Sequence, residues 1–484
     1  MSRSFFLSLI RKLGKIYFSD KKNKEVEYKR TIFYTLKDLG GVYIKFLQVL
    51  SLNHDFMKGW GSPKEYSVFN KVQIESINIK SYIEKINNFE YIEENPFACG
   101  SFAQLYKGKL KTGEIVAIKI LRPSIGTTLK NDLSKLKKMV RLFNRFLPNS
   151  VLDYKIAFEE FSQTCLLETD YEREIANMMY FSNLYKNHKY VVIPRVYNDL
   201  CSKYVIVQDY IEGPTLADIV SNVKPNESLL NFSYNITGSN IWKQVSIAGG
   251  EALCNAITAE YVYGDPHPGN IILLKEDKIA FIDFGIIANK PTSQEAFYLW
   301  TKSYYDFLKG DNNYGKLLQT TYTCFCPDIV NALRRCSTNK DFMESVGDAI
   351  TAKLKNIQKD NQSANNLVQN GHLMKVFTKF LDNKNALNIK FDMNNFQLLK
   401  AILAFINSVT MIDEKEGNNQ FSKIMIESMK YALEYCDEKG VKNDLPVHTK
   451  YNVNESYELL VDTLSFLADG DEYLFENISE GMFL

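Results

Sequence analysis

Paired cysteines are missing from this sequence. Its eight cysteines are scattered, and the one closely spaced stretch, Cys324-Phe325-Cys326, has no matching Cys or His pair at zinc-finger spacing. This spacing argues against a structural metal site. We therefore expect the cysteines to be reduced or buried.

An excess of one charge is missing as well. The 58 Lys and Arg residues almost balance the 57 Asp and Glu residues, so the formal net charge is +1. Such a balance argues against a whole-surface field that would attract nucleic acid or a membrane, although local patches are compatible with it. We expect no nucleic-acid partner.

Long uninterrupted apolar runs are also absent. The most apolar long stretch, Phe396 to Ile412, contains Lys400, Asn407 and Ser408 and is short for a bilayer. We predict no transmembrane helix, and nothing resembles a secretory signal peptide. With 484 residues, 45% of them hydrophobic and 24% charged, the chain is typical of a folded globular protein with two to four domains, or one large domain with extensions.

Acidic residues are absent before Asp20, where apolar residues between Phe5 and Ile16 alternate with Arg11, Lys12 and Lys15. A basic amphipathic start is typical of a mitochondrial transit peptide or a membrane-surface helix, and equally of a helix that packs on the protein body. The compartment therefore stays open: mitochondrial, membrane-associated or otherwise cytoplasmic. A lipid or membrane surface is one expected partner.

The chain does contain a compact set of polar residues around a predicted β-hairpin. Asp265 and Asn270 lie in the stretch 263–270, and Asp283 follows two short apolar runs, 271–274 and 279–282. This order is typical of a kinase catalytic loop followed by a metal-binding loop. Asn270 and Asp283 offer hard oxygen ligands for Mg²⁺, and Asp265 is placed to orient or deprotonate an attacking hydroxyl or water.

A second set of residues lies upstream and is typical of a kinase N-lobe. Small residues at 98–103 form a loop between two predicted strands, and Val116-Ala117-Ile118-Lys119 ends the next strand. Glu174, on a predicted helix, is the candidate partner of Lys119. A predicted strand near 204–212 would be the last strand of the N-lobe and lead into the hinge between the two lobes of a kinase. The candidate nucleotide contacts are Ala98, Cys99, Gly100, Ser101, Phe102, Lys119, Gln208 and Tyr210.

Helical spacing predicts several helices around these motifs. One spans 31–52, with Lys45 and Gln48 on one face, and another spans about 240–261. A third starts near Ser293, and 295–435 is mostly helical. The Asn- and Ser-rich stretch 222–239 predicts an irregular insertion.

In order, these motifs resemble those of the UbiB family of atypical kinases, which includes coenzyme-Q-linked kinase-like proteins. The motifs that carry the resemblance are Lys45-Phe46-Leu47-Gln48, Ala98-Cys99-Gly100-Ser101-Phe102-Ala103-Gln104, Lys119 with Leu121-Arg122-Pro123, Glu168-Thr169-Asp170 with Glu174-Ile175-Ala176-Asn177, and Asp265-Pro266-His267-Pro268-Gly269-Asn270 with Asp283-Phe284-Gly285. Leu47 replaces a family glycine, and Cys99 and Gly100 stand where alanine is usual. We expect Gly100, which frees the backbone, to make ATP binding less constrained than in the family norm.

The resemblance implies an α+β, protein-kinase-like two-lobe fold with an N-terminal helical extension and a helical C-terminal region. It divides the chain into an extension (1–89), an N-lobe (90–212), a C-lobe (213–435) and an acidic tail (436–484). Lys45 and Gln48 would enter the cleft, with Lys45 near Glu168 and Asp170, and would favour ATPase or small-molecule chemistry over protein substrates. ATP and Mg²⁺ are the implied cofactors. Support of ubiquinone or isoprenoid-lipid metabolism is the implied role.

Two other functions stay open. The stretch 263–270 also resembles the catalytic loop of aminoglycoside- or choline-type phosphotransferases, but that interpretation leaves Lys45, Gln48, Glu168 and Asp170 unexplained. A non-catalytic nucleotide-sensing scaffold would need the same binding residues. The sequence leaves the phosphoryl acceptor and the oligomeric state open, a homodimer included.

Overall fold

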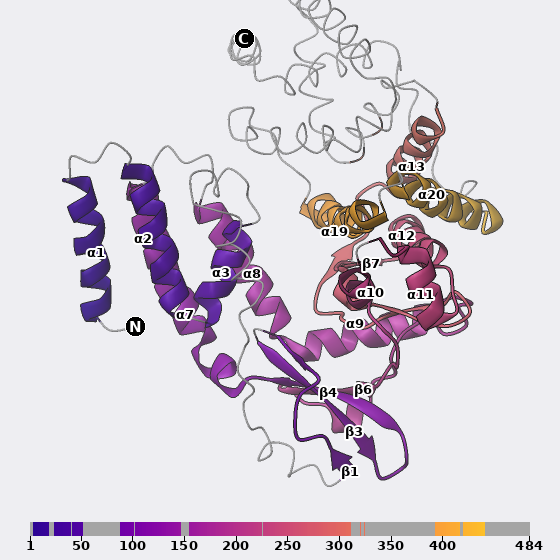
Figure 1. Cartoon of the computed structure of the whole chain (residues 1–484), viewed down its shortest axis with the longest axis horizontal. Coiled ribbons are helices and arrows are strands. Elements are labelled where there is room, and N and C mark those ends of the chain that lie inside the picture. Colours follow the sequence, from indigo (N-terminus) through magenta and orange to yellow (C-terminus); the bar gives the residue numbers. More distant parts are fainter. Residues whose placement is uncertain are drawn as a thin grey trace, which may run out of the picture. The chain divides into compact units, whose positions relative to one another are not determined.

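The computed structural model describes residues 3–18, 24–39, 41–51, 88–100, 102–146, 154–224, 226–310, 320, 324, 393–416 and 420–440 (Figure 1). The chain divides into two compact units. The first unit comprises residues 1–184 and 194–211, and the second comprises 185–193 and 212–484. The four-part division predicted above stays a prediction, and most of the acidic tail lies outside the described residues.

The first unit combines helices with one antiparallel sheet. Its helices are α1 (Arg3–Tyr17), α2 (Lys24–Leu39), α3 (Gly41–Ser51), α7 (Pro123–Phe146), α8 (Tyr154–Glu168), α9 (Tyr171–Leu184) and the short η1 (Asn198–Leu200). Its strands are β1 (Phe89–Ile92), β2 (Ala98–Cys99), β3 (Ala103–Leu110), β4 (Ile115–Leu121) and β6 (Val205–Asp209). They pair in the order β1-β3-β4-β6, and β2 pairs with β3.

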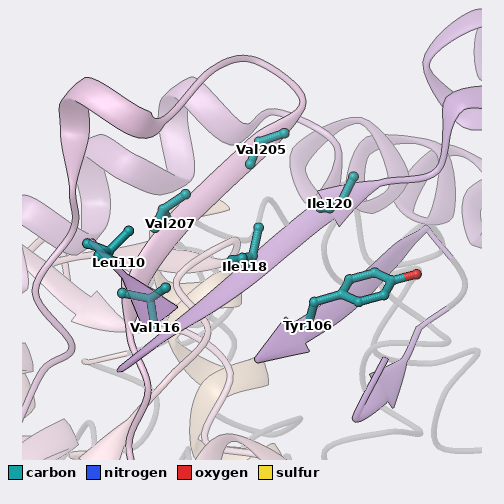
Figure 2. Packing of buried hydrophobic residues seen from close by; sticks show 7 residues of the cluster. All are labelled: Tyr106, Leu110, Val116, Ile118, Ile120, Val205 and Val207. Atoms are coloured by element: carbon teal, nitrogen blue, oxygen red, sulfur yellow. The ribbon is translucent and has the colours of Figure 1, made fainter. Parts of the chain in front are cut away.

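Alternation along the strands gives this sheet two different faces. One face carries a buried apolar cluster (Figure 2). The cluster consists of Tyr106, Leu110, Val116, Ile118, Ile120, Val205 and Val207. The other face carries the intervening residues of the central strands. Lys119 lies on this second face because it falls between Ile118 and Ile120 in β4. The period of two therefore separates the core from the candidate site.

The predicted helix 31–52 is wrong, because the structure has two helices there. α2 ends at Leu39 and α3 begins at Gly41. The φ of Gly41 is +51°, a left-handed conformation that glycine adopts without steric cost and that ends a right-handed helix. α1 packs its buried Leu9 and Leu13 in the first unit and contacts α2. These contacts match the expectation of a start that packs on the protein body.

The second unit is mostly helical. Its helices are α10 (Leu216–Asn222), α11 (Leu229–Thr237), α12 (Ile241–Thr258), α13 (Gln294–Leu308), α19 (Met393–Glu416), α20 (Gln420–Glu438) and the short η2 (Pro268–Asn270). Its strands are β5 (Val191–Val192), β7 (Tyr261–Tyr263), β8 (Ile271–Leu273), β9 (Ile279–Phe281) and β10 (Ile287–Asn289). They form a β5-β9-β8 sheet and a β7-β10 pair.

Helix α12 is in contact with α13, α19 and α20. Close packing requires the Gly249-Gly250 pair in its middle. A Cβ atom on Gly249 would lie 2.3 Å from the ring of Phe405 in α19, and one on Gly250 would lie 2.6 Å from the ring of Tyr431 in α20. The two glycines thus let α12 pack closely against α19 and α20, which lie far from it in the sequence.

The predicted irregular insertion at 222–239 is also wrong, because α11 occupies half of it. The Ser228 side chain caps the helix by accepting the Asn231 N–H. Glu416, at the end of α19, accepts a hydrogen bond from the Leu229 N–H at 2.8 Å and one from the Ser228 hydroxyl at 3.1 Å. A carboxylate at a helix N-terminus is stabilising, and this one comes from a residue that local composition cannot indicate.

The structure bears on the predictions about transmembrane helices and about the cysteines. Among the described residues, no helix is long and apolar enough to cross a membrane. The six described cysteines have free thiols, and four of them are buried: Cys165, Cys254, Cys324 and Cys436.

Candidate active site

The first unit places Lys119 against Glu174. Lys119 Nζ lies 2.6 Å from Glu174 Oε1, and the Glu174 side chain is only 2% exposed. The two residues come from β4 and α9, so the ion pair joins the sheet to that helix. Asp170 caps the helix: its carboxylate accepts the Arg173 N–H at 3.1 Å. The pair predicted from sequence therefore forms, and its catalytic role stays a prediction.

The face of the sheet around Lys119 mixes apolar and polar side chains. Lys119 lies between Leu105 of β3 and Ile206 of β6, and the next row consists of Lys107, Ala117 and Gln208. The aliphatic side chains of Leu105 and Ile206 therefore flank the lysine that the Glu174 carboxylate holds.

The predicted hinge uses its backbone within the sheet. The Asp209 N–H donates to the Arg195 carbonyl at 2.9 Å, and the Tyr210 N–H donates to the Ile115 carbonyl at 3.1 Å. These two donors are therefore engaged within the first unit. The ring of Tyr210 lies edge-to-face with Phe97 at 5.6 Å, and Lys107 Nζ lies 4.2 Å from its centroid. Sequence reasoning missed Phe97, although a large apolar residue directly before the small-residue loop was a usable signal.

The small-residue loop is held by backbone contacts. The Gly100 N–H donates to the Ala103 carbonyl at 2.9 Å, and Arg122 Nε donates to the Gly100 carbonyl at 3.2 Å. Burial lowers the pKa of Arg122, which is only 5% exposed. Ala98 and Cys99 form β2, and Ser101 lies outside the described residues.

Lys45 connects the N-terminal helices to this loop. Its ammonium forms an ion pair with Glu168 and lies 4.3 Å from the centre of the Phe102 ring. Leu47, which replaces the family glycine, is 1% exposed, so the larger side chain is accommodated in the packing of α3. Gln48 lies on the same helix, but its side chain is outside the described ones. Lys45 therefore contacts the small-residue loop itself.

In the second unit, the β8–β9 hairpin brings Asn270 and Asp283 to one end of the same ladder. Ile271 pairs with Phe281, and the Ile282 N–H donates to the Asn270 carbonyl at 3.2 Å. Asn270 Nδ2 donates to Asp265 Oδ2 at 2.9 Å, and Asp283 Oδ1 accepts the Gly285 N–H at 2.9 Å. The antiparallel register thus joins residues from both loops.

Buried contacts fix the position of both loops. A Cβ atom on Gly264 would lie 2.8 Å from the Ile286 carbonyl, so only glycine allows this approach. Ser408 of α19 donates to the Pro266 carbonyl at 3.0 Å. Phe284 is fully buried and lies edge-to-face with Tyr263 at 5.3 Å. Sequence reasoning treated Ser408 only as an interruption of an apolar run, because nothing local indicates its partner.

The other end of the hairpin is fixed to α12. Asp277 accepts the Asn240 N–H at 3.0 Å and forms an ion pair with Lys243 at 2.7 Å. Gln244 Nε2 donates to the carbonyls of Leu274 and Lys278, at 2.7 Å in each case. The hairpin is therefore held at both ends, which limits the movement of Asn270 and Asp283.

The donor chemistry of these loops fits Mg²⁺. The Asn270 amide nitrogen is used on Asp265, which fixes the orientation of its amide oxygen, and Asp283 supplies a carboxylate. The described residues contain no group of three or more His, Cys, Asp and Glu that could hold a metal ion. Mg²⁺ is commonly bound by one or two carboxylates together with substrate phosphates.

Comparison with known proteins identifies the family of this chain. The model of the ABC1 atypical kinase-like domain matches residues 65–314. The chain belongs to the ABC1 atypical kinase-like family. The predicted resemblance to UbiB kinases is thereby confirmed, and so is the kinase-like fold that mixes helices and sheet. The ABC1 match includes Lys119, Glu174, Asp265, Asn270 and Asp283 but ends before α19 and α20.

Curated relatives of this chain include bacterial and plant proteins. It is 30% identical over 259 residues to the "Uncharacterized protein in hydrogenase 1 5'region" of Clostridium pasteurianum, covering 52% of this chain and 46% of that protein. It is 30% identical over 204 residues to "Protein ACTIVITY OF BC1 COMPLEX KINASE 1, chloroplastic" of Arabidopsis thaliana, covering 42% and 28%. It is 26% identical over 289 residues to "Probable protein kinase UbiB" of Cronobacter sakazakii, covering 57% and 50%. The chain thus spans half or less of the length of these three relatives.

A solved structure is also similar to the ABC1 chain, "The complex structure of Rv3197-erythromycin from Mycobacterium tuberculosis". Its TM-score is 0.39 and its identity 22%, covering 66% of this chain and 75% of that one. A TM-score of this size supports no argument about function.

Proposed function

We propose that this ABC1-family chain is an ATP- and Mg²⁺-dependent atypical kinase or ATPase. The observation that carries the proposal is the buried Lys119–Glu174 pair, which Leu105 and Ile206 flank on the face of the sheet. The second unit adds oxygen donors of the type that Mg²⁺ requires, Asn270 and Asp283, on one hairpin.

Each residue has a defined part in the proposed reaction. Lys119 binds the α- and β-phosphates, and Glu174 orients its ammonium. Asp265 orients the attacking hydroxyl or water through the carboxylate that the Asn270 amide holds in place. Asn270 and Asp283 hold Mg²⁺, which supplies charge neutralisation on the phosphate oxygens when bound. Catalysis of this kind depends on positioning and electrostatics more than on covalent chemistry.

Hydrolysis of ATP with and without Mg²⁺ tests this proposal. We expect activity that EDTA abolishes and that Asp283→Asn lowers about a hundredfold or more, since one main electrostatic group is lost. Asp199→Asn is the matched control, because Asp199 is exposed in the first unit and belongs to no proposed site. Wild-type hydrolysis by Asp283→Asn would refute the metal assignment.

We also propose that the acceptor or activator is an isoprenoid or phenolic lipid, in support of ubiquinone or isoprenoid-lipid metabolism. The contact of Lys45 with Glu168 and Phe102 favours this over a general phosphotransferase, because it puts an extension helix against the nucleotide loop. Stimulation of hydrolysis by phenolic or isoprenoid head-group mimics is the expected result. Phosphorylation of an aminoglycoside or choline instead would support the alternative.

A scaffold that only senses nucleotide makes a different prediction for the catalytic loop. Asp265→Ala removes the group that orients the nucleophile, while Lys119 and Asp283 keep their places. In the proposed enzyme this variant binds ATP but fails to rescue the defect of cells that lack the protein. Full rescue by Asp265→Ala would favour the scaffold.

The partner that we propose for α1 is an anionic membrane surface. Arg11, Lys12 and Lys15 are exposed on this helix, and Tyr17 and Phe18 are 60% and 85% exposed at its end. Basic residues beside aromatic ones are typical of helices that lie at a lipid interface. Co-sedimentation with vesicles that contain phosphatidylglycerol should be lost when Arg11, Lys12 and Lys15 are all changed to Glu, and retention would contradict the proposal.

A further inference from the structure

A buried polar cluster in the second unit is not used by the mechanism above. Its centre is Glu251 of α12, which is only 3% exposed. Glu251 Oε1 accepts a hydrogen bond from the Tyr431 hydroxyl of α20 at 2.5 Å and lies 2.9 Å from His188 Nε2. Tyr185 is hydrogen-bonded to Glu251 as well, and its hydroxyl accepts the Asn255 amide at 2.6 Å. The carboxylate is therefore surrounded by neutral donors.

The hydrogen bonds of His188 define its tautomer. Its Nδ1 accepts the backbone N–H groups of Tyr190 and Val191, at 3.2 Å and 3.0 Å. An acceptor nitrogen carries no proton, so the proton of the neutral ring lies on Nε2 and donates to Glu251. The imidazole thus connects the carboxylate to the backbone at the start of β5.

Strand β5 continues this connection to the metal loop. Val191 pairs in parallel with Ile279 of β9, and the Ile279 N–H donates to the Tyr190 carbonyl at 2.8 Å. β9 ends at Phe281, two residues before Asp283. The series of contacts therefore runs from Tyr431 through Glu251 and His188 into the strand that ends two residues before the proposed metal ligand.

We propose that Glu251 and His188 are positioning residues for Asp283, and that Tyr431 makes this positioning depend on helix α20. This proposal rests on the proposed function, because the series of contacts ends at the metal site that the proposed function assigns to Asp283. α20 lies after the residues that the ABC1 model matches, whereas His188 and Glu251 lie within them. Helix α20, which packs along α12 (Figure 1), is then part of the proposed enzyme's working unit.

Each bond in the series can be removed by a near-isosteric change. Tyr431→Phe removes the donor on α20 and keeps the ring. His188→Gln keeps a donor for Glu251 and loses the acceptor for the Tyr190 and Val191 amides, while His188→Asn does the reverse. Tyr435→Phe is the matched control, because Tyr435 lies one turn further along α20. Burial raises the pKa of both tyrosine hydroxyls, so both are protonated at neutral pH.

Hydrogen–deuterium exchange of the full-length chain tests the series without reference to activity. We expect amides in 279–285 to exchange about fivefold to tenfold faster in Tyr431→Phe and in His188→Gln, which is the effect of one lost hydrogen bond. His188→Asn should keep the protection of Tyr190 and Val191, and Tyr435→Phe should match the wild type. Unchanged exchange in 279–285 in both Tyr431→Phe and His188→Gln would overturn the proposal.

The Mg²⁺ dependence of ATP hydrolysis then separates positioning from a purely structural role. At saturating ATP, Tyr431→Phe and His188→Gln should raise the half-maximal Mg²⁺ concentration about threefold to tenfold. Faster exchange with an unchanged Mg²⁺ requirement would overturn the positioning role. If the wild type does not hydrolyse ATP, the proposed function fails. The positioning role is then tested by hydrogen–deuterium exchange of the same variants with ATP, as the Mg²⁺-dependent protection of the amides in 279–285.

Discussion

In the first unit, the cations of the candidate site lie against carboxylates, Lys119 on Glu174 and Lys45 on Glu168. In the second unit, Asp265 accepts a hydrogen bond from the Asn270 amide, and Asp283 accepts one from the Gly285 N–H. A paired carboxylate orients a cation but offsets its charge. A hydrogen bond from an amide orients a carboxylate oxygen. These contacts therefore orient cations in the first unit and carboxylates in the second.

The largest effect should come from the more buried ion pair of the first unit. Glu174→Gln leaves Lys119 without its counterion and should lower the free energy of unfolding by about 3 kcal/mol. Glu168→Gln is the matched change at the more exposed pair, where Glu168 is 30% exposed, and should cost less than about 1 kcal/mol. Urea unfolding of both variants measures the difference. Equal losses would mean that burial does not distinguish the pairs.

The next effect concerns the helix packing that supports the second unit. Gly249→Ala places a Cβ atom 2.3 Å from the Phe405 ring, and overpacking of this kind should cost about 2 kcal/mol. Thermal unfolding measures it. Gly14→Ala in α1 is the control, because no atom lies within 4 Å of its Cβ position, and it should stabilise by up to about 1 kcal/mol. A neutral Gly249→Ala would contradict the packing account.

A smaller effect is expected from the hydrogen bond that holds the catalytic loop. Ser408→Ala removes the donor to the Pro266 carbonyl and should cost about 1 kcal/mol, with a similar loss in kcat/KM for ATP. The control is Ser428→Ala, whose hydroxyl donates to Ile424 within its own helix at 2.8 Å. If both variants keep full activity, α19 does not position the loop.

The smallest effect should come from the phosphate loop of the first unit. A Cβ atom on Gly100 meets the Ala103 carbonyl at 3.7 Å, an ordinary contact, so Gly100→Ala should change stability by less than about 0.5 kcal/mol. ATP affinity should still fall about twofold to fivefold, because alanine restricts the backbone that approaches the phosphates. Calorimetric titration with ATP measures this. An unchanged ATP affinity would show that the backbone freedom of Gly100 does not contribute to nucleotide binding.

Prediction from sequence succeeded where a strand or hairpin must have apolar residues at a fixed spacing, with turn residues at its ends. The strand that carries Lys119 and the hairpin between Asn270 and Asp283 follow from apolar runs bounded by turns, and both are present. The break at Gly41 and the helix over 229–237 were missed. A positive φ and a capping carboxylate from Glu416 decide these two features, and neither is visible in a local pattern.

The amino-acid sequence by itself determined the family, the strand and helix periods of the motifs, and the candidate residues for phosphate and metal. These depend on side-chain chemistry and short-range spacing, which are present in the unfolded chain. Only the tertiary structure decided that Lys45 contacts Phe102, that Ser408 holds the Pro266 carbonyl, and that Glu251, His188 and Tyr431 meet in one buried cluster. Such contacts join residues far apart in the chain, and a buried polar group finds its partner only when packing excludes water from both.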